Sequence, residues 1–273
     1  MALFPVFDHV ALNVRRELDE AAEAFERLGF SLTPRGYHSM GSANHLAIFA
    51  TDYLELLGLP PKAEIVRREL LEWRYGINGL VFGSEDNAHV GRELAARGVP
   101  APPARSFTRP VTLADGSTEE ARFSTLTVDS SVVDYGRFYF CQHSTRHLVW
   151  RDEFREHRNG AVGIESVVIS ADDPAAAAEV YRRIFGADAV SATADGYVMA
   201  VGLGRVEIVS KAQAIARFGP SLNDDMPVHM KAVVLRTRSL ERARACVPEA
   251  GAFGGRLVAT GAGLFGAAIE FVG

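Results

Sequence analysis

The sequence predicts an α+β fold built from four repeats of one βαβββ-type unit. A step of 20 residues leads from His9 to Gly29, and equal steps to a glycine start at Asn78, Ser166 and Lys231. Each step opens on a short apolar stretch, breaks at polar residues and resumes as an amphipathic run that ends at the glycine. This recurrence along the whole chain indicates an internal repeat of strand, turn and helix.

In the first unit, the apolar residues of 18–28 fall on one stripe and acidic residues on the other, which predicts an amphipathic helix. Gly29 follows directly and is a natural end for it. After the helix we expect a short strand at 30–32 and two longer strands at 44–49 and 53–57. The unit therefore has the order βαβββ.

The other units repeat this order with variations. The second is predicted to have strands at 77–82, 122–128 and 137–141, a helix at 86–97 and a hairpin turn at Asp115-Gly116. The third starts at Ile164, with a helix at 174–185, strands at 197–201 and 205–209, and an extra helix at 211–218. The fourth runs from Met230 through a helix at 240–250 to a strand at 267–272.

Length and composition set the broad class. A chain of 273 residues with 48% hydrophobic residues can form two domains, and we expect these at 1–150 and 163–273, joined by a linker at 151–162. The net charge of −5 and the lack of a long basic run argue against nucleic-acid binding. The sequence has neither a membrane-length apolar run nor an export signal at its start, and Cys141 and Cys246 suit free thiols. We therefore expect a cytoplasmic protein without membrane contact.

The closing strands of three units each carry a glutamate among apolar residues: Glu55, Glu207 and Glu270. Burying a carboxylate is costly unless it is paired or bound to a cation. Strand alternation places His9 on the face opposite Val10, and it places Glu55 opposite Leu54. If helices cover the apolar faces, His9 and Glu55 project from the free side of one sheet. Imidazole and carboxylate together are good ligands for a divalent metal.

The segments Asp8-His9-Val10, Asn44-His45-Leu46 and Tyr53-Leu54-Glu55-Leu56, with Cys141-Gln142-His143 further on, resemble the vicinal oxygen chelate superfamily. They are most similar to its glyoxalase-like domain subgroup. The resemblance covers nearly the whole chain through its four units. It implies that the units pair into two cups, with metal ligands on the first and last strands of the units that line a cup.

Carried over to this chain, the resemblance implies His9, Glu55 and His143 as metal ligands, with the ion being Zn, Ni, Mn or Fe. In the second unit Asn78 stands in the place of His9 and Tyr139 in the place of glutamate. Each ligand has an alternative role: His9 as a core histidine, Glu55 as the partner of an arginine such as Arg35, and His143 as an exposed residue.

In the second half, Ser166 and Lys231 stand in the histidine places, beside Glu207 and Glu270. A lysine ammonium between two carboxylates would occupy the place of the cation. We therefore expect the second cup to hold a structural ion pair and no metal, and a non-haem iron triad there is disfavoured.

The residues expected to contact a substrate are Asn44, His45, Tyr139, Arg146 and Trp150. The resemblance implies a metal-dependent lyase, isomerase or ring-cleaving enzyme acting on a small substrate with vicinal oxygens. The alternative it implies is a binding protein of the bleomycin-resistance type, which sequesters a small molecule without catalysis. Because paired cups in this superfamily are often completed across dimers, a homodimer is a further expectation.

Overall fold

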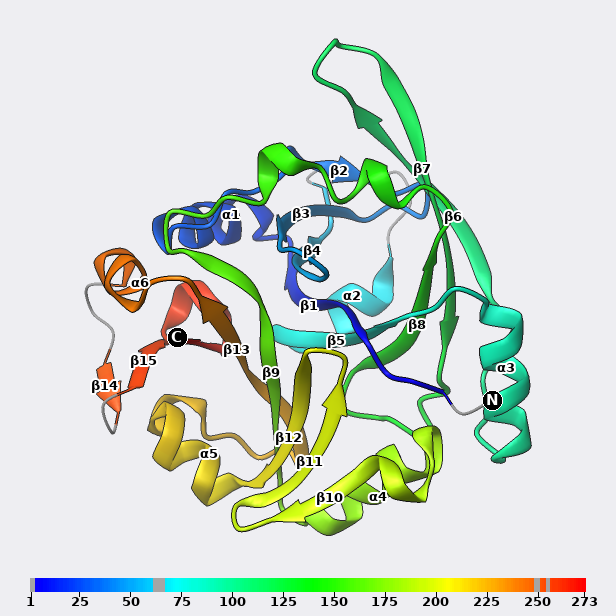
Figure 1. Ribbon diagram of the computed structural model, residues 1–273, viewed down its shortest axis with the longest axis vertical. Coiled ribbons are helices and arrows are strands. Elements are labelled where there is room, and N and C mark those ends of the chain that lie inside the picture. Colours follow the sequence, from blue (N-terminus) through cyan, green and yellow to red (C-terminus); the bar gives the residue numbers. More distant parts are fainter. Residues whose placement is uncertain (1–2, 61–66, 248–250, 254–255) are drawn as a thin grey trace.

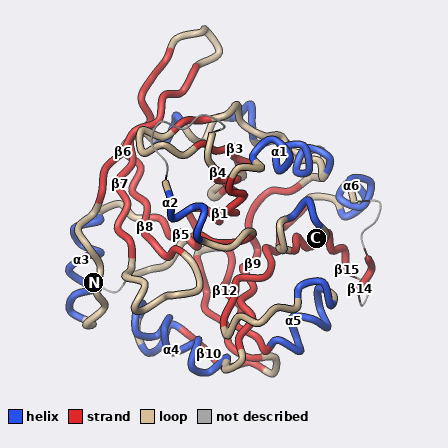
Figure 2. The backbone as a smooth tube through the Cα atoms, turned by 180° about the vertical axis from the view of Figure 1, so that it is seen from behind, coloured by secondary structure: helices blue, strands red, loops and turns tan. Residues whose placement is uncertain are grey.

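Two mixed sheets of eight strands each make up the framework of the protein, and most helices lie at the periphery of the strands (Figure 1, Figure 2). The structure is a computed structural model that describes residues 3–60, 67–247, 251–253 and 256–273. The first sheet has the order β2 (Gly36–Tyr37), β3 (Ala43–Ile48), β4 (Tyr53–Gly58), β1 (Phe7–Arg15), β5 (Gly76–Gly83), β8 (Arg137–His143), β7 (Thr118–Thr127) and β6 (Arg105–Thr112).

The second sheet repeats this arrangement. Its order is β10 (Val190–Thr193), β11 (Gly196–Val201), β12 (Gly204–Ser210), β9 (Ala161–Ala171), β13 (Val228–Thr237), β16 (Ala268–Val272), β15 (Arg256–Ala259) and β14 (Gly251–Phe253). In each sheet the opening strands of two units pair antiparallel at the centre, and each opening strand pairs in parallel with the last strand of its own unit. This confirms the predicted α+β fold of four βαβββ-type units paired two by two.

Five helices agree with the sequence periodicity in place and mostly in length: α1 (Leu18–Arg27), α3 (Asn87–Ala96), α4 (Pro174–Phe185), α5 (Lys211–Phe218) and α6 (Leu240–Cys246). The short helix α2 (Arg68–Glu72) was not predicted. Five short 3₁₀ turns lie at η1 (Arg146–Leu148), η2 (Asp152–Phe154), η3 (Ala187–Ala189), η4 (Pro220–Leu222) and η5 (Ala262–Leu264). The predicted end of the last helix, 248–250, lies outside the described residues.

The strand predicted at 30–32 is wrong. Phe30 is buried against Phe25, Phe49 and Phe271, and the N–H of Ser31 donates to Nδ1 of His157 over 3.0 Å. The backbone of this segment is thus engaged by a side chain from the 151–162 segment, and the next strand begins only at Gly36. The division into domains at that segment stays a prediction, but His157 and Asn159 within it are buried against the first half.

The largest hydrophobic core lies between the two sheets, on the faces that carry the helices. It joins Val10 and Phe82 of the first sheet to Phe185 of α4 and Ile169 of the second sheet. The Phe82 and Phe185 rings have centroids 5.0 Å apart. Because the apolar faces of both sheets are consumed by this core, their opposite, concave faces are left for polar side chains.

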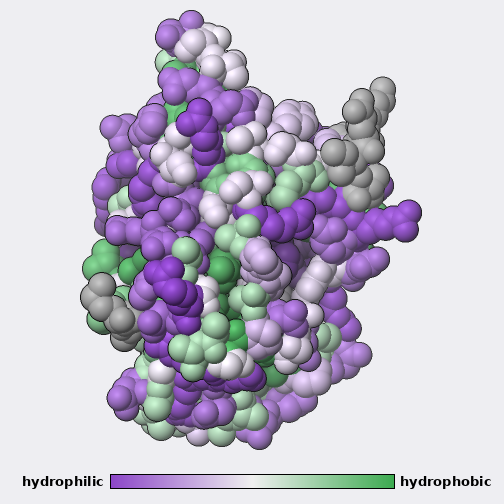
Figure 3. All heavy atoms as spheres, turned by 90° about the vertical axis from the view of Figure 1, so that its right-hand side faces the viewer, coloured by the Kyte–Doolittle hydropathy of each residue, from purple (hydrophilic) through white to green (hydrophobic). Residues whose placement is uncertain are grey.

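The β6–β7 hairpin extends beyond the body of the molecule (Figure 1) and appears at the top of the space-filling view (Figure 3). Its turn contains Asp115 and Gly116 as predicted, with Gly116 at φ 84°. At its base the hairpin meets the loop after β2, because Ser39 N donates to the carbonyl of Thr108 over 3.1 Å. This contact joins the two edges of the first sheet and closes its concave face into a cup.

We predict that Gly29→Ala lowers the free energy of unfolding by about 2–3 kcal/mol, measured by urea unfolding. Gly29 has φ 86°, and a Cβ there would lie 2.6 Å from Sγ of Cys246 and 2.9 Å from the backbone nitrogen of Asn159. Gly98→Ala is the matched control, since Gly98 has φ 64° but no atom within 4 Å of its Cβ position, so only backbone strain of about 1 kcal/mol is expected. Equal losses in both variants would contradict the crowding argument.

Candidate functional site

A β-bulge in β1 places two consecutive side chains in the cup. Phe7 pairs with Phe82 and His9 pairs with the next residue, Val81, so Asp8 is an extra residue in this strand. Since a bulge interrupts the alternation of side chains, Asp8 and His9 both turn to the concave face. Simple alternation from the sequence predicts only one of them there.

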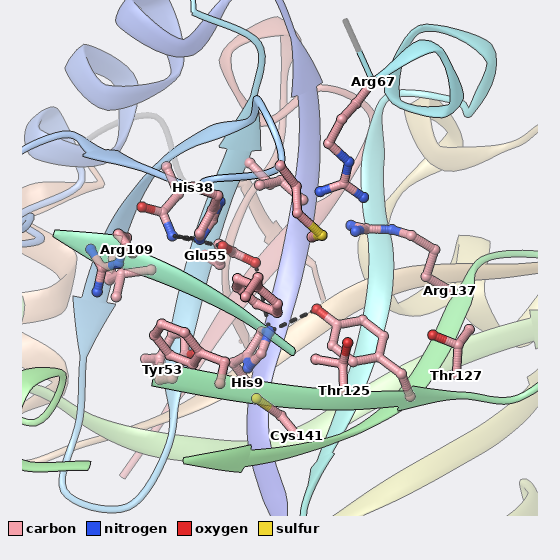
Figure 4. Close-up of a pocket in the computed structure, with 17 residues that line it drawn as sticks. His9, His38, Tyr53, Glu55, Arg67, Arg109, Thr125, Thr127, Arg137 and Cys141 are labelled. Atoms are coloured by element: carbon pink, nitrogen blue, oxygen red, sulfur yellow. Dashed lines mark hydrogen bonds and ion pairs between the residues drawn. The ribbon is translucent and has the colours of Figure 1, made fainter. Parts of the chain in front are cut away.

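The imidazole of His9 is held on three sides. Its Nδ1 lies 2.6 Å from a carboxylate oxygen of Asp8, and its ring stacks on Tyr53 at 4.5 Å between centroids. Its Nε2 points into the cavity, 3.6 Å from Oε2 of Glu55 and 2.9 Å from the hydroxyl of Tyr139 (Figure 4). Because Asp8 is the natural acceptor for Nδ1–H, the Nε2 lone pair faces the cavity, where the Tyr139 hydroxyl can donate to it.

Glu55 reaches the same point from β4. Its Oε1 accepts a 2.7 Å hydrogen bond from Nδ2 of Asn44. Burial alone would raise the pKa of Glu55, but the charges of His9 and His38 and the bond from Asn44 lower it below its usual range. Arg35, the predicted alternative partner, instead pairs with Asp19. Glu55 is therefore an ionised carboxylate beside an imidazole.

His143 lies on the other side of Asp8. Its Nε2 is 3.0 Å from Asp8 Oδ2 and 3.5 Å from Sγ of Cys141. Ligand atoms of Asp8, Cys141 and His143 lie within 4.8 Å of one another, and they are the only such group of three among the described residues. The structure thus brings two of the predicted ligands, His9 and Glu55, into contact and places His143 behind the shared carboxylate of Asp8.

Two of the five predicted substrate contacts, Asn44 and Tyr139, line the cavity. His45 faces the other side of β3, where Nδ1 bonds to the carbonyl of Thr33 over 2.8 Å. Arg146 and Trp150 lie outside the lining: the guanidinium carbon of Arg146 sits 3.4 Å from the Trp150 ring centroid. Trp150 in turn packs on Tyr53 and His143 from behind.

The cavity also contains four basic residues that the sequence reasoning did not select: His38, Arg67, Arg109 and Arg137 (Figure 4). Arg137 shares strand parity with Tyr139, so alternation alone was a sufficient signal for it. Arg109 lies on β6, a strand that was not predicted, and the other two lie in connections outside any strand. The space that the lining residues surround, open mouth included, is about 720 Å³.

A family model for a glyoxalase-like domain matches residues 7–185 of the chain. The chain belongs to this family, within the vicinal oxygen chelate superfamily. That superfamily includes metal-dependent dioxygenases and epimerases. No curated protein matches the chain.

Solved structures with low sequence identity share the glyoxalase-like fold. A hypothetical protein from Staphylococcus aureus superimposes with a TM-score of 0.71 at 13% identity, over 97% of this chain and 98% of that one. A variant of 4-hydroxymandelate synthase from Streptomyces coelicolor gives 0.56 at 11% identity, over 90% and 74%. A xylose isomerase-like TIM barrel/4-hydroxyphenylpyruvate dioxygenase fusion protein gives 0.54 at 11% identity, over 90% and 38%. At these identities the comparisons show the fold alone.

The second cup of this glyoxalase-like chain is filled by an ion network, but its central cation differs from the predicted one. Arg217 of α5 lies between the two carboxylates, 2.7 Å from Glu207 and 2.8 Å from Glu270. Lys231 instead pairs with Asp224. The prediction of Lys231 was wrong because α5, inserted between the third and fourth units, brings a longer cationic side chain over the sheet.

The described part of the chain contains no helix long and apolar enough to cross a membrane.

Proposed function

We propose that this protein is a metal-dependent enzyme of glyoxalase-like type, acting in the first cup on a small substrate with vicinal oxygens. His9 and Glu55 are its proposed metal ligands. The observation that carries the proposal is the 3.6 Å separation of His9 Nε2 and Glu55 Oε2 inside a cavity. Two ligand atoms at 2.0–2.2 Å from one tetrahedral ion lie about 3.4 Å apart, so the pair fits a shared divalent ion.

The surroundings of His9 support this assignment. Metal-binding histidines usually donate their second ring N–H to a carboxylate, which fixes the tautomer and the ring plane. Asp8 supplies that acceptor at 2.6 Å. We assign His143, which was predicted as the third ligand, to the support of Asp8 from the opposite side, where Nε2 contacts the same carboxylate. The donor types suit Zn, Ni, Mn or Fe.

In the proposed reaction the metal ion and the protein side chains have different roles. A bound divalent ion would supply Lewis acidity to two adjacent oxygens of the substrate. Burial raises the pKa of Tyr139, so its hydroxyl stays protonated and can donate a hydrogen bond to a developing oxyanion. Asn44 keeps Glu55 oriented through the bond to Oε1. Isomerisation of a hemithioacetal, epimerisation and ring cleavage all use such an arrangement.

Elemental analysis after reconstitution with each candidate metal and removal of excess tests the proposal. We expect the wild type to retain about one equivalent, and His9→Ala and Glu55→Gln to lose it. Asp8→Asn should weaken metal affinity by about 10–100-fold, because it removes the acceptor that holds His9. The exposed His147 provides the control His147→Ala, which should bind metal as the wild type does. The proposal would be contradicted if the wild-type protein took up no ion and its stability were unchanged by EDTA.

A second candidate function is binding of a small molecule without catalysis. The observation that favours it is the bond between Tyr139 and His9, since the hydroxyl satisfies Nε2 at 2.9 Å without any ion. A binder of this kind would hold its ligand equally well after metal removal and after His9→Ala. The metalloenzyme would lose metal and turnover together in that variant.

A further inference from the structure

We propose that the first cup binds the oxyanion of a small carboxylic or phosphoric acid with an apolar body, through Arg137 assisted by Arg67. The side chains of Arg67 and Arg137 lie close together on one side of the cavity, and Arg109 lines it on the opposite side of Glu55 (Figure 4). Glu55 is the only carboxylate among the described residues that line it. The cup therefore carries an excess of positive charge.

Arg137 is a half-buried cation without an ion-pair partner among the described residues. Its Nε donates to Oδ1 of Asn78 over 2.8 Å, while its Nη2 is buried and has no partner among the described residues. No described carboxylate lies within 4.0 Å of this guanidinium. Burial lowers the pKa of Arg137 and the nearby charge of Arg67 adds to this, while Tyr139, Glu55 and Glu69 act in the opposite direction.

Arg109, on the facing wall of the cavity, also lacks an ion-pair partner among the described residues. Its side chain is 5% exposed, its Nε has no partner, and no described carboxylate forms an ion pair with it. The backbone of Gly36 gives it room, because a Cβ on that glycine would lie 2.5 Å from Nη1. Space is thus kept for a guanidinium whose Nε has no hydrogen-bond partner in the described part of the chain.

Arg67 is different, because Glu69 neutralises part of its charge over 2.7 Å and Ser42 accepts a further bond over 3.1 Å. Two uncompensated guanidinium groups remain. Leaving a charge buried and unpaired is costly, whereas a carboxylate or phosphate matches the planar fork of arginine with two parallel hydrogen bonds. An anionic ligand is therefore the partner that this cavity lacks.

The rest of the lining defines the body of the ligand. Phe107 and Phe123 stack at 5.0 Å between centroids, and Met40 and Leu46 extend the apolar wall. An aryl or branched alkyl group fits this surface, with its acid group at the arginines. The identity of this anion as the substrate rests on the proposed function. Its binding does not, because the arginines can bind an anion without a metal.

Isothermal titration calorimetry on metal-stripped protein tests the inference with three probes: benzoate, phenyl phosphate and the neutral benzyl alcohol. We expect at least one anion to bind at least 10-fold more tightly than the alcohol, and the better anion identifies the acid group. Arg137→Met, which keeps the length without the charge, should weaken that anion at least 10-fold, and Arg109→Met should weaken it less, because Arg109 lies on the facing wall. Arg122→Met is the control, because Arg122 is exposed on β7 and outside the lining.

Thermal unfolding separates this role from a structural one. Replacing an unpaired buried charge by an apolar side chain of similar shape should leave the melting temperature unchanged or raise it. A lower melting temperature in Arg137→Met with unchanged anion affinity would overturn the inference, and so would equal binding of all three probes or none. If the protein binds the anion but takes up no metal on reconstitution, only the proposed enzyme is refuted. If it takes up metal but shows no preference for the anions, only the arginine site is refuted.

Discussion

Replacing Arg217 by alanine is expected to lower the free energy of unfolding by about 3–5 kcal/mol, because it leaves two carboxylates of the second cup without their shared cation. Glu270 is 1% exposed and Glu207 17%, and Arg217 bridges them at 2.8 and 2.7 Å. Burial alone would lower the pKa of Arg217, but the charges of Glu207 and Glu270 raise it, so the bridge stays ionised. Urea unfolding at pH 7 measures the loss.

The control lies within the same network. Arg256 also contacts Glu270 at 2.8 Å, but its side chain is 50% exposed, so Arg256→Ala should cost no more than about 1 kcal/mol. After Arg217→Ala, Glu207 keeps only Arg205 at 3.1 Å and Glu270 keeps only Arg256 as an ion-pair partner among the described residues, so adding Glu207→Gln and Glu270→Gln should recover part of the stability. An Arg217→Ala protein as stable as Arg256→Ala would show that water, and not the arginine, neutralises the second cup.

The fold could be predicted because it repeats. The spacing from an apolar strand to a glycine marks each unit independently, and the amphipathic stripe of α1 or α4 needs only local information. The segment at 30–32 shows the limit of that information. The segment Phe30-Ser31-Leu32 has the right composition for a strand. The backbone N–H of Ser31 instead donates to His157, more than 120 positions away.

In the candidate site, too, some residues could be predicted from the sequence and others could not. Alternation along β1 and β4 is sufficient to bring His9 and Glu55 to one face, since the pairing of the two strands is regular from His9 to Asn13. Asp8 could not be predicted, because its orientation follows from a bulge that depends on the register with β5. The prediction of Lys231 as the central cation of the second cup was wrong for a related reason: position in a repeat does not reveal which side chain from an added helix, here Arg217, reaches across a sheet.

A second large effect is expected at Asp52, which links the halves of the molecule. Its Oδ1 accepts a 2.9 Å hydrogen bond from the backbone N–H of Ile164 on β9, and its side chain is buried. Burial raises its pKa from 3.8 to about 6, although the bonds from Ile164 and Thr51 act in the opposite direction. Near neutral pH the protein therefore holds an ionised carboxylate in a place that favours the protonated form.

The sign of the pH dependence follows from this raised pKa. Well below pH 3.8 Asp52 is protonated in both the folded and the unfolded state, and its burial carries no ionisation penalty. As pH rises the unfolded chain ionises near 3.8 and the folded protein only near 6, so the contribution of Asp52 to stability falls across this window and is fully lost above it. The full loss is on the order of 3 kcal/mol, at 1.36 kcal/mol for each pKa unit.

Asp52→Asn should abolish this dependence, because the amide oxygen can still accept the Ile164 N–H and carries no charge. We expect the variant to exceed the wild type in unfolding free energy by up to about 3 kcal/mol at pH 7, with the difference vanishing well below pH 3.8. Urea unfolding of both proteins across that range measures it, and Asp195→Asn, at an exposed position, should show no difference at any pH. A less stable Asp52→Asn protein at pH 7 would mean that the ionised carboxylate itself stabilises the contact between β9 and the first sheet.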